Sequence, residues 1–109
     1  MDDNVLRDLL IQRLALVGDM ARLNAAQLQI RQLLGGRELA LALAERDGGE
    51  GADAALALAR DAVAEVAARL AAGEAELDGL GARLDAIDAR IAVLNAPSGG
   101  DRSVQSGGR

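Results

Sequence analysis

Aliphatic residues recur every seven positions through the second half of the chain. One heptad position is occupied by Leu56, Val63, Leu70, Leu77, Leu84 and Ile91. The position three residues later is occupied by Ala59, Val66, Gly73, Leu80, Ile87 and Leu94. Six consecutive heptads with small or aliphatic residues at both positions are typical of a coiled-coil helix. The pattern predicts a helix over residues 53–95.

The first half of the chain carries a matching but less regular seam. Its members are Leu6, Leu9, Arg13, Leu16, Met20, Leu23, Gln27, Ile30, Leu34, Arg37, Leu41 and Ala44. Three of them are polar, yet the heptad spacing is kept and predicts a helix over residues 3–46. Two helices that face each other along these seams form an all-α, antiparallel coiled-coil hairpin.

Turn-forming and capping residues set the ends of the two expected helices. Asp2, Asp3 and Asn4 offer N-caps for the first helix, and Asp53 is expected to cap the second. Residues 47–52 form a glycine-rich turn between the helices. The hairpin therefore spans residues 1–96, and the Gly/Ser-rich tail at residues 97–109 is expected to be disordered.

In an antiparallel hairpin, each seam residue in the first half of the chain faces a seam residue in the second half. We expect the register in which the numbers of two facing residues add to 100. This register places the long polar side chain of Gln27 opposite Gly73, where there is space for it. It also places opposite charges side by side at the flanking positions, Asp19 with Arg83 and Glu38 with Arg60.

Two alternatives to a simple hairpin stay open. Gly35-Gly36 would break the first helix into two if their low helix propensity prevailed, giving three helices. Residues 39–44 and 55–59 alternate between Leu and Ala, which formally resembles a β-hairpin across the turn. Because Ala is a poor strand former and the heptads run through the second segment, we expect helix there.

Composition excludes several classes of site. The chain has no Cys and no His, so it lacks the usual zinc and haem ligands, and it has no Phe, Tyr or Trp for stacking on single-stranded nucleic acid. A net charge of −5 argues against binding to nucleic acid or to an anionic membrane. All twelve basic residues are Arg, which favours a GC-rich bacterial or phage genome. No apolar stretch is long enough to span a membrane, and we expect a cytoplasmic protein.

Candidate chemistry is sparse, so we expect no enzyme, no cofactor and no metal ion. The serines, Ser98, Ser103 and Ser106, all lie in the tail, far from any base of the usual kind. Residues 48–51 lack the Lys and Ser or Thr that follow the glycines of a phosphate-binding loop. The carboxylates Glu74, Asp78 and Asp85 share part of a helix face and are interpreted as a solvated surface.

Hydrophobic residues outside the seams bear most directly on function. The first helix has a second stripe, about 100° around its axis, made of Leu10, Leu14, Val17, Ala21 and Leu28. The second helix has a row of small residues, Ala68, Ala75, Ala82, Ala89 and Ala96. Near the turn, three leucines point in several directions: Leu39, Leu43 and Leu58.

A wide apolar arc is typical of a helix that packs on more than one neighbour. Three explanations are open: a broader core within the hairpin, a homo-oligomer such as a four-helix bundle formed by two hairpins, or a complex with a different protein. We expect a non-enzymatic interaction module, either an assembly adaptor or an oligomerisation element. The alternative is a small acidic inhibitor that occupies a basic groove of a target through Glu74, Glu76, Asp78, Asp85 and Asp88.

Overall fold

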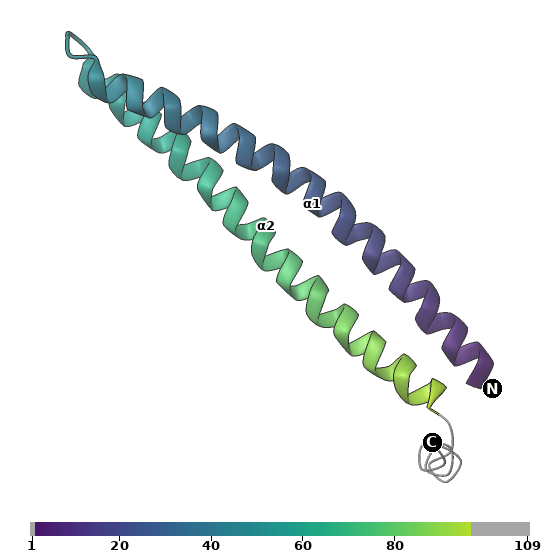
Figure 1. Cartoon of the computed structure of the whole chain (residues 1–109). Coiled ribbons are helices and arrows are strands. Elements are labelled where there is room, and N and C mark those ends of the chain that lie inside the picture. The colour runs from purple at the N-terminus through teal and green to yellow at the C-terminus, as the bar shows by residue number, and fades with distance from the viewer. Residues whose placement is uncertain (1, 97–109) are drawn as a thin grey trace, which may run out of the picture.

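The computed structural model describes residues 2–96, and these form two long antiparallel helices joined by a short turn (Figure 1). Helix α1 spans Asp2–Arg46 and helix α2 spans Ala52–Asn95. No strand occurs among the described residues. The predicted all-α hairpin is confirmed, while the expected disorder of the tail at residues 97–109 lies outside the described residues.

Helix α1 is continuous through its paired glycines. Gly35 and Gly36 lie in helical conformation, and a Cβ atom added at either position would lie in open space. The three-helix alternative is therefore wrong. Residues 39–44 and 55–59 are also helical, which excludes the β-hairpin alternative. The seam on either side of the glycines continues to contact α2, and this packing outweighs the low propensity of two residues.

The turn depends on one glycine in a left-handed conformation. Gly51 has φ 77° and ψ 1°, and it precedes the first residue of α2. The amide of Asp47 donates to the carbonyl of Leu43 at 3.1 Å, and the amide of Ala52 donates to the carbonyl of Gly49 at 3.1 Å. Asp53 is not the N-cap, so that prediction is wrong: the chain reverses at Gly51, and Asp53 lies inside the first turn of α2. Its carboxylate there still favours the helix N-terminus.

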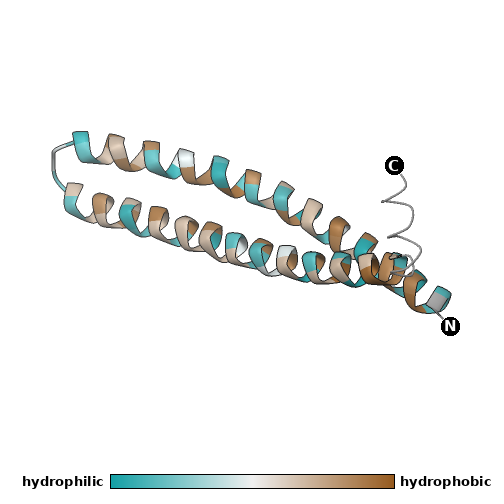
Figure 2. Ribbon diagram, turned by 60° about the horizontal axis from the view of Figure 1, so that its bottom comes forward, coloured by the Kyte–Doolittle hydropathy of each residue, from teal (hydrophilic) through white to brown (hydrophobic). Residues whose placement is uncertain are grey.

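The predicted seams form the contact between the helices; we call the α1 part the core seam. Leu9, Leu16 and Val66 are buried, and most other seam residues are half-buried. Arg13 and Arg37 are exposed, because a long charged side chain reaches water from a seam position. Several hydrophobic residues gather where the start of α1 meets the end of α2 (Figure 2). The core is thus one narrow line of side chains between two helices.

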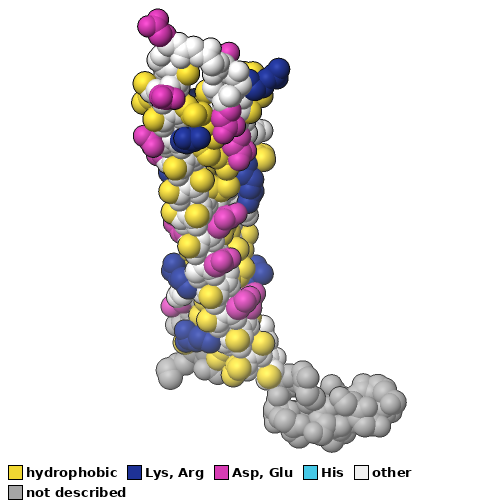
Figure 3. Space-filling model, turned by 90° about the vertical axis from the view of Figure 1, so that its left-hand side faces the viewer, with side chains coloured by type: hydrophobic (Ala, Val, Ile, Leu, Met, Phe, Trp, Pro, Cys, Tyr) yellow, Lys and Arg dark blue, Asp and Glu magenta, His cyan; other side chains and the backbone are white. Residues whose placement is uncertain are grey.

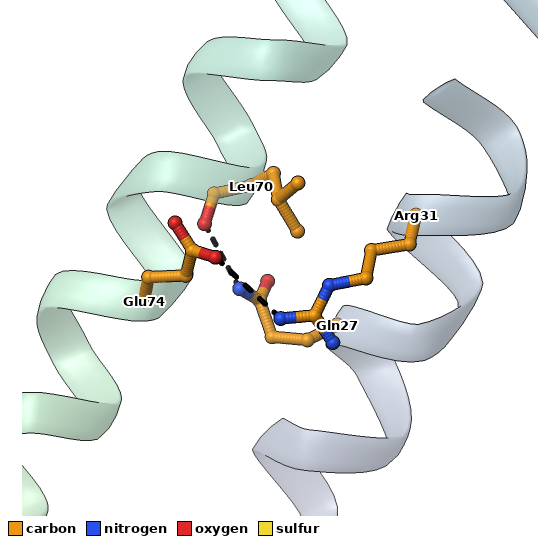
Figure 4. Close-up of polar contacts among 4 residues, drawn as sticks. All are labelled: Gln27, Arg31, Leu70 and Glu74. Atoms are coloured by element: carbon orange, nitrogen blue, oxygen red, sulfur yellow. Dashed lines mark hydrogen bonds and ion pairs between the residues drawn. The ribbon is translucent and has the colours of Figure 1, made fainter. Parts of the chain in front are cut away.

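A polar layer crosses the seam where Gln27 meets Gly73. Gln27 is only 1% exposed, and its Nε2 donates to the carbonyl oxygen of Leu70 at 2.9 Å (Figure 4). A Cβ atom added to Gly73 would overlap the Gln27 amide, so the glycine makes room for this side chain. The predicted pairing of Gln27 with Gly73 is confirmed, and with it the register of the hairpin. The Oε1 atom of Gln27 is buried without a hydrogen-bond partner.

Charged pairs along the helices differ from those expected. Arg13 Nε donates to Asp88 Oδ1 at 2.7 Å, and Arg31 donates to Glu74 Oε2 at 3.5 Å, so both pairs join α1 to α2. Asp19 pairs with Arg22, one turn further along α1, and not with Arg83. Within residues 2–96, Glu38 and Arg60 also form no ion pair. Neighbours on one helix are already close, so Asp19 loses less side-chain freedom by pairing with Arg22 than by reaching across to α2.

Candidate functional site

The most prominent uncovered surface is the predicted second stripe of α1. Leu14 is 74% exposed, and Leu10, Val17, Ala21 and Leu28 are also exposed. Helix α2 does not cover any of them, so they do not broaden the core of the hairpin. Of the three explanations for the stripe, the one that places it in the chain's own core is wrong.

Sequence reasoning missed part of this surface. Ile11 is 58% exposed and lies next to the stripe, as do Gly18 and Ala25. Together with three residues of the stripe they form a continuous line with alternating spacings of three and four residues. We call this line the second seam: Ile11, Leu14, Gly18, Ala21, Ala25 and Leu28. The sequence did contain a signal for this line. Its residues have the same heptad spacing as the core seam, and each precedes a core-seam residue by two positions.

The second seam lies on the opposite side of α1 from α2. Each of its members is two residues away from a member of the core seam, for example Leu14 from Leu16 and Ile11 from Leu9. At about 100° per residue, two residues correspond to about 200° around the helix, which is about 160° measured the other way round. In the space-filling view, hydrophobic side chains reach the surface along the length of one face of the hairpin (Figure 3). A helix that bound the second seam would therefore contact α1 without displacing α2.

The three leucines near the turn are all exposed. Leu39, Leu43 and Leu58 are each more than half exposed. Leu58 lines a hollow with Leu33 and Ala62. Their role as a contact surface stays a prediction.

A further apolar area lies at the other end of the hairpin and was also missed. Val93 and Val5 are exposed, and they line a hollow together with Ala89, Arg90 and Leu94. Leu94 was expected to pair with Leu6 in the core, but it is 37% exposed. The last layer of the seam is covered from one direction only, because α2 ends at Asn95.

The acidic residues proposed for the inhibitor do not form one continuous surface of unpaired carboxylates. Glu74 binds Arg31 and Asp88 binds Arg13, both at the edge of the contact between the helices. Glu76 lies on the other flank of the α2 seam, where it lines a hollow with Asp19, Arg22 and Arg83. This leaves Asp78 and Asp85, which are exposed and make no ion pair within residues 2–96.

The row of small residues on α2 is exposed from Ala68 to Ala89. Ala96 was included in this row but follows the end of α2, where its amide donates to the carbonyl of Val93 at 3.3 Å. No large side chain lies in the row, so it offers close approach but little apolar area. It is a weaker candidate interface than the second seam.

The described part of the chain has neither a metal-binding cluster nor a membrane-spanning helix. Residues 2–96 contain no group of three or more His, Cys, Asp or Glu side chains placed to hold a metal ion. Neither of the two described helices is both long and apolar enough to cross a membrane.

Comparison with protein families, with curated proteins and with solved structures gives no match for this chain.

Proposed function

We propose that the chain is a non-enzymatic protein–protein interaction module, a helical hairpin that binds another helix along the outer side of α1. The observation that carries this proposal is the second seam. It keeps coiled-coil spacing from Ile11 to Leu28 and contains no charged residue, and all its members except the half-buried Gly18 are exposed. Coiled-coil spacing on an exposed surface is the pattern by which helices recognise other helices.

The small core of the hairpin supports the same conclusion. Only Leu9, Leu16 and Val66 are buried among the hydrophobic residues of the described chain. Two helices bury only one line of side chains against each other, whereas a third or fourth helix would add a second line. Binding along the second seam would therefore stabilise the hairpin as well as the complex.

The acidic-inhibitor alternative receives less support. An inhibitor that fills a basic groove needs carboxylates that are free to meet the target's cations. Here Glu74 and Asp88 already bind arginines of α1. Glu76 lies on the other flank of the α2 seam from these two acids, in a hollow with Arg22 and Arg83.

The proposal is tested by charging Leu14, which lies in the second seam, and Val17, which flanks the seam three residues further along α1. The variant Leu14→Arg with Val17→Asp should keep its helical content and lose its partner, because both side chains are exposed in the hairpin but buried in a complex. The matched control is Ala68→Arg with Ala75→Asp on α2, which makes the same change in charge on another exposed surface. Light scattering gives the mass in solution, and affinity capture from the producing cells reveals a foreign partner.

Either a mass above 11.2 kDa or a captured protein supports the proposal if the α1 variant abolishes it and the α2 control does not. The proposal is overturned if the wild-type chain is monomeric and binds no protein in a manner that depends on Leu14 and Val17. It is also overturned if the α1 variant and the control behave alike.

A further inference from the structure

The second seam has a specific order of side-chain sizes. Large residues stand at its ends, Ile11 and Leu14 at one and Leu28 at the other. Small residues, Gly18, Ala21 and Ala25, stand between them. Arg7 and Gln32 occupy the next seam positions on either side, so the apolar part is about 26 Å long at 1.5 Å per residue. A helix that binds along the whole second seam must therefore be apolar over the same length.

A second copy of α1 in antiparallel orientation meets this requirement. If facing residues have numbers that add to 39, Ile11 faces Leu28 of the other copy, and Leu14 faces Ala25. Gly18 then faces Ala21, and two-fold symmetry repeats each layer. All six layers are apolar, and the smallest residues lie at the centre, where the two backbones approach most closely.

The neighbouring registers do not keep all the layers apolar. Moving one copy by a heptad in one direction places Leu14 opposite Gln32, and moving it in the other direction places Ala25 opposite Arg7. Both shifts bury a polar side chain against the seam, which is costly without a hydrogen-bond partner. One register is therefore favoured over its neighbours.

The distribution of charge also favours contact between two α1 helices. Within its bounds α1 has six arginines and six acids, and is neutral, whereas α2 has four arginines and eight acids. Two α2 helices would repel each other, but two α1 helices would not.

Resting on the proposed function, we infer that the second seam binds a second copy of this chain, with the two α1 helices antiparallel in the register that pairs Leu14 with Ala25. The dimer is a layer of four helices with both α1 helices inside and both α2 helices outside. It differs from a compact four-helix bundle because the second seam lies opposite α2 and not beside it. Both core seams stay intact in this arrangement.

Engineered cysteines test the register directly, because the chain has no native Cys. The double variant Leu14→Cys with Ala25→Cys should form a covalent dimer in a glutathione redox buffer. Within one helix these positions are eleven residues and about 16 Å apart, too far for a bridge, which needs Cα atoms within about 7 Å. The matched controls are the single variants Leu14→Cys and Ala25→Cys. Neither should cross-link, since identical residues lie far apart in the antiparallel pair.

The outcomes separate this inference from the proposed function. A covalent dimer of the double variant alone, with a wild-type mass of twice 11.2 kDa by light scattering, is the expected result. Cross-linking of a single variant would show a parallel pair and overturn the inference. A wild-type monomer with no cross-link in the double variant would overturn it too. If that monomer still captured a foreign protein through Leu14 and Val17, only the inference would fail; without such a partner, the proposed function would fail as well.

Discussion

The two seams of α1 have the same heptad spacing but different surroundings. The core seam is covered by α2, and its Leu16 is 4% exposed, whereas Leu14, two residues earlier in the second seam, is 74% exposed. Both are leucines in the middle of one helix, so neither hydrophobicity nor helix propensity distinguishes them. The comparison teaches that periodicity identifies the apolar faces of a helix, while the chain's own connectivity decides which face is covered.

The largest expected difference between the seams comes from truncating these two leucines. Leu16→Ala should lower the free energy of unfolding by about 3 kcal/mol, because it removes a buried side chain and leaves a cavity. Leu14→Ala should change the stability of the hairpin itself by less than about 0.5 kcal/mol, because its side chain is exposed. Urea unfolding followed by circular dichroism measures both.

The measurement must be made over a range of protein concentrations. A dimer through the second seam would add a concentration-dependent stability that Leu14→Ala removes, because association favours the folded state. If Leu14→Ala costs as much as Leu16→Ala even at the lowest concentration, Leu14 is buried within the monomer, and the distinction between the seams is lost.

Two glycines provide a second comparison. Gly73 lies on α2, where it faces the core seam, and Gly18 lies in the second seam. Gly73→Ala should destabilise the hairpin by about 1–3 kcal/mol, because the added methyl group overlaps the buried Gln27 amide. Gly18→Ala in the second seam should stabilise α1 by up to about 1 kcal/mol, because Ala has the higher helix propensity. An added Cβ there would lie 3.6 Å from the Arg22 guanidinium, an ordinary contact.

Adding Gln27→Ala to Gly73→Ala tests whether the clash causes the loss. The shorter side chain leaves room for the methyl group, so the double variant should recover part of the lost stability in thermal unfolding. If Gly73→Ala alone is neutral, Gln27 has another place to go, and it does not fix the register of the hairpin.

The architecture of the hairpin was readable from the sequence because it rests on many weak, repeated signals. Six heptads in α2 tolerate Gly73, and the seam of α1 tolerates Arg13 and Arg37. The register was predicted by facing the two seams, and the long Gln27 opposite a residue without a side chain supported it independently. These features can be predicted from the sequence because they depend only on the spacing of the residues and the size of their side chains.

Other features depended on local geometry that spacing does not encode. The start of α2 is set by the left-handed conformation of Gly51, so Asp53 was wrongly placed as its cap. Asp19 was expected to reach Arg83, but the nearer Arg22 binds it. The sequence suggested one acidic surface on α2, but Glu74 and Asp88 bind arginines of α1, which lie 43 residues away in the case of Glu74.

The turn decides which seam of α1 is covered, and one glycine position controls the turn. Gly51→Ala should destabilise the hairpin by about 1–2 kcal/mol, because a residue with a Cβ is strained at positive φ. Gly49→Ala is the matched control in the same turn, where φ is not positive and an added Cβ meets nothing within 4 Å. It should be neutral or stabilising by up to about 1 kcal/mol. Equal losses in thermal unfolding for the two variants would contradict the role given to Gly51.

The smallest expected effect concerns the ion pair between Arg13 and Asp88, which lies at the edge of the core seam. Both side chains are more than 40% exposed, so the 2.7 Å contact is screened by water and should contribute less than about 1 kcal/mol. A double-mutant cycle with Arg13→Ala and Asp88→Ala measures this coupling, and the corresponding cycle for Asp19 and Arg22 serves as a control for an ion pair within α1. Both couplings should shrink in 1 M salt, because the screening length falls to about 3 Å.

A coupling for Arg13 and Asp88 well above that of the control pair, and insensitive to salt, would contradict this expectation. It would mean that charge selects the core seam for α2. If the coupling between Arg13 and Asp88 is small, charge does not distinguish the two seams, and they differ only in that α2 covers the core seam. The neutral charge of α1 then leaves the second seam free to bind by apolar contact alone, as the core seam does.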